Sequence, residues 1–272
     1  MKKIALLFMI MFLMAGIGGM ACAEDSLQAI KNRGVLRVGV KDLTPGFALA
    51  DIKTGEISGY DVDIARAIAR KLGVRMEITP IGGLEEQERI SILTEGRVDL
   101  VAATMTRTKD RKTLIDFSYT YFVTPQKFLV RKGTLQRLSD LKNKKIGTVD
   151  KTTSVMNLRK ALPSATVVLF SDYVPAFLAL QNGEIFAVTT DEAILAAILA
   201  KADEGVFEIP KVSISKELYG LGVRKGHASF LNFVNQTLLE MEKSGEAKKI
   251  YDKWFGPESR MPLQRTFKIT AK

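Results

Sequence analysis

The sequence predicts an α/β protein of two lobes, each a mixed, mostly parallel sheet flanked by helices. Short apolar runs alternate with amphipathic segments, and the order strand-helix-strand-helix-strand occurs twice along the chain. The 272 residues leave about 100 residues for each lobe behind an N-terminal export segment. With 46% apolar and 26% charged residues, the composition is that of a globular protein.

The first 23 residues have the three parts of a secretory signal peptide. A basic start at residues 2–3 precedes an apolar run at 4–14, and residues 21–23 read Ala-Cys-Ala, which fits the cleavage pattern. Cleavage after residue 23 predicts a soluble exported protein, whereas cleavage before Cys22 would leave a lipid anchor. We favour the soluble product, because Gly19 stands where a lipoprotein signal usually carries a branched apolar residue.

The helix predicted over residues 61–72 belongs to the first of the two series of alternating strands and helices. Ile64, Ile68 and Leu72 recur at helical spacing and therefore share one face. Gly73 follows as the expected C-terminal cap. The first series comprises strands over 35–40, 74–79 and 98–102, with helices over 61–72 and ending near residue 96.

The second series repeats this alternation without repeating the sequence. No Gly/Ser-rich or Pro-rich linker lies between the series, so ordered strands are expected to join the lobes, the first over residues 121–131. We assign residues 24–126 and 218–272 to lobe 1 and residues 127–217 to lobe 2. The further elements are strands over 145–149, 166–170, 185–189 and 218–224, and helices over 153–162, 173–181, 191–201, 229–242 and 246–255.

Charge and residue counts exclude several classes of function. The net charge is +10, and loss of the signal peptide removes two of the 40 basic residues. Aromatic residues do not alternate with basic ones, so nucleic-acid binding is not predicted. One Cys and one His rule out a disulfide framework, a multi-Cys zinc site and a His-rich metal site. No catalytic motif, metal or cofactor is predicted.

Residues 59–69 carry the pattern of a known family. They read Gly-Tyr-Asp-Val-Asp-Ile followed by an apolar helix, which resembles the signature of the family 3 periplasmic solute-binding proteins. By itself the pattern is a helix start in which Asp61 and Asp63 complement the helix dipole. The resemblance continues in order over nearly all the mature chain, through residues 97–100, 104–112, 116–121, 138–142, 146–147, 152–154, 187–191, 244–247 and 253–255.

This family supplies the receptors of polar amino-acid ABC importers. The resemblance therefore implies a two-lobed type II periplasmic-binding-protein (Venus-flytrap) fold and a periplasmic monomer. It also implies an amino-acid ligand and an inner-membrane ABC permease with its ATPase as partners. The chain departs from the family pattern at Thr104 and Lys151, where a glycine or small residue is usual, and at Phe186, where Asp is usual.

The resemblance further implies which residues bind the α-carboxylate. Arg111 would bind it, because a guanidinium matches a carboxylate with two parallel hydrogen bonds. The alternative is that Arg111 is a surface arginine beside Asp110. Thr152 and Thr153 precede a predicted helix, where free N–H groups favour an anion. Their alternative role is that of a simple helix cap.

Asp191 would accept the α-ammonium group, helped by the Thr106 hydroxyl and the Thr104 carbonyl. The alternative for Asp191 is another helix cap, since a helix is predicted to follow. In this interpretation Arg111 and Asp191 belong to different lobes. The ligand would then bridge the lobes and drive their closure.

Lys41 and Arg89 are the candidates for binding the ligand side chain. Both resemble basic residues of the aspartate/glutamate-binding members, and two cations would select an acidic ligand and repel a basic one. Alternatively, Lys41 is solvated and Arg89 pairs with Glu85 or Glu86 along its helix. Glutamine or asparagine is the next choice of ligand, with Tyr219 as an added wall.

An enzyme on the same scaffold is the alternative from another class. Cyclohexadienyl dehydratases resemble this family and carry a Glu three residues after the Asp of the second lobe. Ile194 occupies that position here, which removes the proton donor that such chemistry needs. The sequence therefore predicts a non-enzymatic receptor of glutamate or aspartate.

Overall fold

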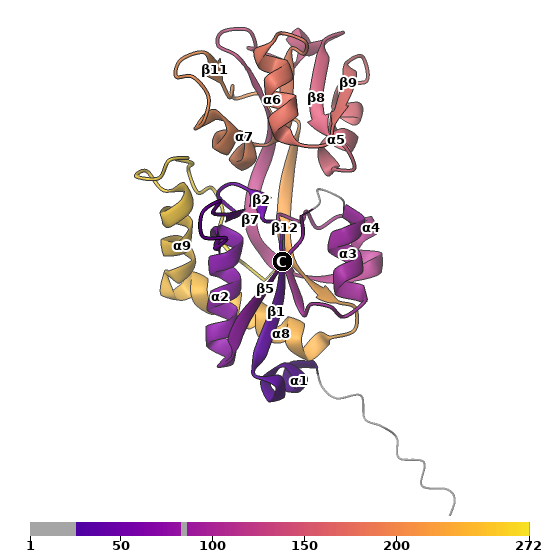
Figure 1. Ribbon diagram of the computed structural model, residues 1–272. Helices are drawn as coiled ribbons and strands as arrows, with labels where there is room; N and C mark the ends of the chain where they lie inside the picture. Colours follow the sequence, from indigo (N-terminus) through magenta and orange to yellow (C-terminus); the bar gives the residue numbers. More distant parts are fainter. Residues whose placement is uncertain (1–25, 83–85, 272) are drawn as a thin grey trace, which may run out of the picture.

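The computed structural model describes residues 26–82 and 86–271. They form two lobes, which the long strands β7 (Ile115–Arg131) and β12 (Ser215–Arg224) connect (Figure 1). The predicted signal peptide and Cys22 lie outside the described residues. The expectation that ordered strands join the lobes is confirmed, because β7 and β12 pair with each other along this connection.

One sheet passes through both lobes in the order β5-β1-β6-β12-β7-β10-β8-β9, with β11 paired to β7. In lobe 1, β1 is parallel to β5 and β6; in lobe 2, β8 is parallel to β9 and β10. The joining strands β7 and β12 are antiparallel. The bounds are β1 (Val35–Val40), β5 (Arg75–Pro80), β6 (Leu100–Ala102), β8 (Lys145–Val149), β9 (Thr166–Phe170), β10 (Ala187–Asp191) and β11 (Phe207–Glu208).

Helices flank the sheet in both lobes (Figure 1). Helix α2 (Tyr60–Leu72) ends where Gly73 adopts the left-handed conformation, with φ of 77°, as predicted. The other helices are α1 (Ser26–Arg33), α3 (Glu86–Thr94), α4 (Lys109–Leu114), the 3-10 turn η1 (Leu138–Leu141), α5 (Thr153–Ala161), α6 (Tyr173–Gln181), α7 (Glu192–Leu199), α8 (Ala228–Ser244) and α9 (Glu246–Phe255).

Lobe 1 has an aromatic core. Phe47 and Phe122 are buried with their ring centroids 4.9 Å apart, and Tyr60, Tyr219 and Phe255 pack around them. Edge-to-face and offset pairs of this kind contribute about 0.5–1.5 kcal/mol each beyond the area that they bury. This core joins β7 and β12 to helices α2 and α9, and so fixes the base of the connection between the lobes.

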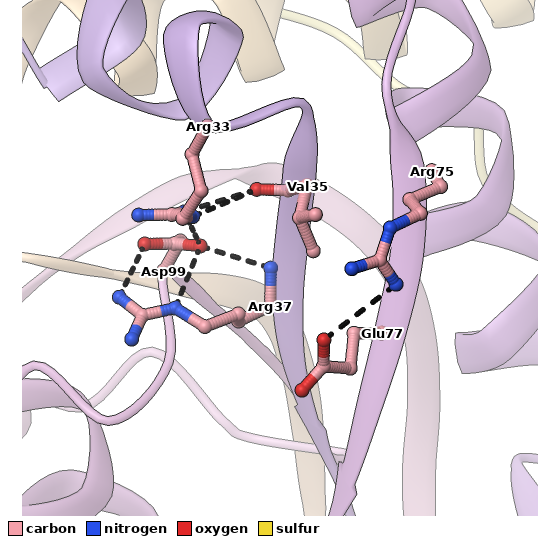
Figure 2. A network of polar contacts seen from close by, with 6 residues as sticks. All are labelled: Arg33, Val35, Arg37, Arg75, Glu77 and Asp99. Carbon is pink, nitrogen blue, oxygen red and sulfur yellow. Dashed lines mark hydrogen bonds and ion pairs between the residues drawn. The ribbon is translucent and has the colours of Figure 1, made fainter.

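Asp99 links β1 to the segment before β6. Its carboxylate accepts the backbone N–H of Arg37 at 2.9 Å and also bonds the guanidinium groups of Arg33 and Arg37 (Figure 2). On β5, Arg75 and Glu77 form a looser ion pair at 3.7 Å. Asp99 belongs to a block that carried the family resemblance, and its contacts here are structural.

Several elements differ from their predicted form, and β7 begins at Ile115 rather than at residue 121. β10 begins at Ala187 rather than 185, because the N–H groups of Glu184 and Ile185 still donate to Ala179 at the end of α6. β12 begins three residues before the predicted 218, where the chain already pairs with β7. The short strands β2 (Leu43–Thr44), β3 (Ala48–Ala50) and β4 (Ile57–Ser58) form a separate sheet that was not predicted. The division of the chain at residues 126 and 217 stays a prediction.

Candidate functional site

A polar cavity lies between the two lobes. It contains about 340 Å³ of space free of protein atoms, part of it open to solvent. The structure brings all eight predicted ligand residues together around this space, and their role in binding stays a prediction. The lining residues are Lys41, Arg89, Thr104, Thr106, Arg111, Thr152, Thr153, Ser154, Tyr173, Thr190, Asp191 and Ile194.

Strand ends and helix starts place these side chains. Lys41 directly follows β1 and Thr104 follows β6, while Asp191 ends β10 on the opposite lobe. Residues at the carboxyl ends of parallel strands meet at one edge of a sheet, where α/β proteins bind ligands. The two lobes turn these edges toward each other, so the cavity receives side chains from both.

Arg111 is buried in lobe 1, with 2% of its surface exposed. Its Nη1 donates to the carbonyl oxygen of Thr106 at 2.8 Å, and its backbone N–H donates to the Thr108 hydroxyl, which caps α4. The interpretation of Arg111 as a surface arginine beside Asp110 is therefore wrong. Its guanidinium is instead held in place at the wall of the cavity.

Asp191 is buried in lobe 2, and its two carboxylate oxygens differ. Oδ2 accepts a hydrogen bond from the Tyr219 hydroxyl, whereas Oδ1 is buried and has no hydrogen-bond partner among the residues described. Burial and the nearby charge of Glu217 raise the pKa of Asp191 to about 7. The helix-cap interpretation is wrong, because the Asp191 side chain does not bond the first N–H groups of α7. A buried carboxylate oxygen without a donor favours a cationic ligand group.

Lys41 is buried, with 5% of its surface exposed, so the interpretation of a solvated lysine is also wrong. Its Nζ lies 5.9 Å from the ring centroid of Tyr173, which belongs to the opposite lobe. Burial and the charge of Arg89 lower the pKa of Lys41 to about 7. Arg89 is also buried and donates to the carbonyl oxygen of Ala103 at 3.0 Å. The alternative pairing of Arg89 with Glu85 or Glu86 involves side chains outside those that the structure describes.

The threonines line the cavity in different ways. The Thr152 hydroxyl donates to the Val149 carbonyl at 2.7 Å and does not cap α5, so the cap interpretation is wrong for this side chain. The N–H groups at the start of α5 therefore keep their capacity to bind an anion. The Thr106 hydroxyl donates to Glu217 at 2.8 Å.

Two of the departures from the family pattern share a backbone feature. Thr104 and Lys151 have left-handed φ angles of 48° and 54°. Non-glycine residues in this region cost about 1–3 kcal/mol, which explains why a glycine suits position 104. Phe186 packs against the apolar cluster of lobe 2, in agreement with a structural role.

Sequence reasoning missed three residues of lobe 2 that line the cavity: Ser154, Tyr173 and Thr190. The Tyr173 hydroxyl forms a hydrogen bond with that of Thr190 at 2.8 Å. Tyr173 begins α6 after a strand, and this helix-start position is the signal that could have indicated it. Tyr219 was expected to form a wall, but its hydroxyl instead binds Asp191.

Comparison with known proteins decides the family. The model of the bacterial extracellular solute-binding proteins, family 3, matches residues 36–257. The chain belongs to this family. As a family 3 solute-binding protein it has the two-lobed type II periplasmic-binding-protein fold, and the predicted resemblance is confirmed. Among residues 26–82 and 86–271, no helix combines the length and the apolar character of a membrane span.

Relatives of this family 3 protein bind different amino acids. The ABC transporter glutamine-binding protein GlnH of Bacillus subtilis is 36% identical, over 85% of each chain. The L-glutamate/L-aspartate-binding protein of Pseudomonas aeruginosa is 30% identical, over 85% of this chain and 80% of that one. The solved structure of an ancestral arginine-binding protein bound to glutamine is 39% identical, covers 82% of this chain and 99% of that chain, and has a TM-score of 0.73.

Proposed function

We propose that this protein is the periplasmic receptor of an amino-acid ABC importer, which binds an L-amino acid between its lobes and delivers it to an inner-membrane permease with its ATPase. The observation that carries the proposal is that Arg111 of lobe 1 and Asp191 of lobe 2 line the same cavity. A free amino acid presents a carboxylate and an ammonium on one carbon, and these two residues match both charges. The unsatisfied Asp191 oxygen supports the role of ammonium acceptor.

The charges around the cavity favour an acidic side chain. Lys41, Arg89 and Arg111 are basic and Asp191 is acidic among the lining residues. The α-carboxylate and α-ammonium of the ligand use Arg111 and Asp191, which leaves two cationic side chains. Glutamate or aspartate supplies the missing negative charge, whereas arginine or lysine would meet like charges.

Glutamine is the second candidate, and the low pKa of Lys41 favours it. Near neutral pH part of the Lys41 population is uncharged and can pair with a neutral amide as readily as with a carboxylate. The relatives are compatible with either ligand, since GlnH binds glutamine and the Pseudomonas protein binds the acids.

A thermal-shift screen of the twenty amino acids tests the proposed function. We expect a saturable rise in melting temperature with L-glutamate or L-aspartate. Ligand at a hundred times its dissociation constant stabilises the folded protein by about 2.7 kcal/mol, a rise that the screen detects readily. A shift with arginine or histidine but with neither acid would contradict the assignment of the side-chain pocket, and no shift at all would contradict the receptor itself.

Lys41→Met should weaken glutamate binding by roughly ten- to a hundredfold and change glutamine binding by less than about threefold, because the variant removes a charge and keeps the bulk.

In the wild type, the ratio of glutamate to glutamine affinity should fall as the pH rises through about 7, where Lys41 loses its proton. The ratio cancels the titration of Asp191, which affects both ligands alike. Calorimetric titration of the wild type between pH 6 and 8 measures this ratio. Equal losses of glutamate and glutamine affinity in Lys41→Met would contradict the role of Lys41.

Ile194 lines the cavity at the position where the dehydratases carry a glutamate. An apolar side chain donates no proton to a leaving group, which supports a receptor rather than an enzyme. Formation of phenylpyruvate from prephenate by the purified protein would reverse this assignment.

A further inference from the structure

The peptide group that joins Ala103 and Thr104 has a buried charged side chain at each end. Arg89 donates from Nη1 to the Ala103 carbonyl at 3.0 Å, and the Thr104 N–H donates to Asp61 Oδ2 at 3.0 Å. Arg89 and Asp61 are 4% and 1% exposed. Hydrogen bonds to charged groups are about twice as strong as neutral ones, so this peptide plane is firmly held.

The residue that follows this peptide group needs such support. Thr104 has a φ of 48°, in the left-handed region that β-branched residues rarely adopt. Released from its contacts, a threonine would favour a negative φ, and that rotation would move the Thr104 backbone at the wall of the cavity. A glycine would keep the left-handed conformation without help.

The Asp61 side chain is itself held in place by a hydrogen bond from a buried tyrosine. Its Oδ1 accepts the Tyr121 hydroxyl at 2.6 Å, and the Tyr121 carbonyl accepts the Tyr60 hydroxyl at 3.0 Å. Asp61 is not among the residues that line the cavity, and Thr104 is. Asp61 therefore influences the cavity indirectly, through its hydrogen bond with the Thr104 N–H. It also complements the dipole of α2.

We propose that Asp61 is a positioning residue for ligand binding, which holds the Thr104 N–H and thereby keeps Thr104 in the left-handed conformation that shapes the cavity wall. This rests on the proposed function, in which the Thr104 backbone helps to bind the ligand ammonium. The second acidic residue of the same signature, Asp63, has a different role. It bonds Trp254 Nε1 at 2.8 Å and Lys253 at 2.7 Å on the outside of lobe 1.

The test compares Asp61→Asn with Asp63→Asn, the same substitution two residues away on the same helix turn. Calorimetric titration is done at pH 8, above the pKa of about 7 to which burial raises Asp61. The probe is L-glutamate, or L-glutamine if only that ligand gives a thermal shift. Asp61→Asn should weaken binding about tenfold and Asp63→Asn less than twofold. In a Thr104→Gly background, Asp61→Asn should cost less than about threefold, because glycine needs no support.

Equal losses for Asp61→Asn with and without Thr104→Gly would overturn the proposal, as would equal losses for Asp61→Asn and Asp63→Asn. If Asp61→Asn alone does not fold, the double variant Asp61→Asn/Thr104→Gly is compared with Thr104→Gly. An affinity loss of tenfold or more between these two would also overturn the proposal. Amide hydrogen exchange over residues 102–106 needs no ligand. It should accelerate in Asp61→Asn and not in Asp63→Asn. Unchanged exchange would overturn the positioning role, whereas a wild type that binds no amino acid would overturn only the proposed function.

Discussion

Arg111→Ala is expected to weaken the binding of every amino acid by roughly 30- to 4,000-fold. Truncating one partner of a buried charge pair costs about 2–5 kcal/mol, much of it because the other charge is left without a partner. The α-carboxylate is common to all amino acids, so the loss should not depend on the ligand side chain. Calorimetric titration with several ligands measures this. Arg111→Lys should bind with intermediate affinity, because it keeps the charge and loses the two parallel hydrogen bonds.

Arg107→Ala is the matched control for this experiment. Arg107 lies four residues earlier, is half-buried and donates to the Thr120 hydroxyl at 2.8 Å, outside the cavity lining. It should lower the melting temperature of the ligand-free protein without changing the spectrum of ligands. Arg111 also holds the Thr106 carbonyl, so part of its effect is structural. If Arg111→Ala retained affinity within about threefold, the carboxylate would have to bind elsewhere.

Asp191→Asn should have the opposite effects on binding and on the stability of the empty protein. Binding should fall by roughly 30-fold or more, because the ligand ammonium loses its charged acceptor. The pKa of Asp191 is raised from 3.8 to about 7 by burial, so the folded protein binds this proton more tightly than the unfolded chain does. Stability therefore decreases as the pH rises from about 4 to 7, and the ionised group is most destabilising above 7. Asparagine does not ionise, so the ligand-free variant should melt at a higher temperature at pH 8.

Melting temperatures between pH 5 and 8, with and without ligand, test this expectation. Asp203→Asn is the control, since Asp203 is exposed in the same lobe and does not line the cavity. It should change neither binding nor the pH dependence. An Asp191→Asn variant that was less stable than the wild type at pH 8 would show that Asp191 is already compensated in the empty cavity.

The sequence predicts most of this fold because the regular elements have strong periodic signals. The strand over residues 35–40 and the helix over 246–255 agree with the structure at both ends, since apolar spacing and flanking glycines define them. The strands β2 to β4 have only two or three residues each, too few for a period to appear. Their pairing is a tertiary effect that local propensity does not encode.

The candidate site was accessible to sequence reasoning for a related reason. Lys41 and Asp191 lie directly at strand ends, and parallel strands gather their ends at one edge. The family resemblance supplied Arg111 and the threonines. The positive φ of Thr104 and the contact that Asp61 makes with it depend on how distant segments pack. The first acidic residue of the signature therefore looked like a simple helix start.

The paired strands β7 and β12 form an antiparallel ribbon that joins the lobes in place of a flexible linker. A two-stranded ribbon twists and bends while its ladder of hydrogen bonds stays intact. Motion of one lobe against the other would then deform this ribbon elastically and leave both cores packed. Tyr219 stands on the ribbon next to its register shift and binds Asp191. Through this hydrogen bond the twist of the ribbon should affect the orientation of Asp191, so we expect a substitution in the ribbon to alter affinity without touching the ligand.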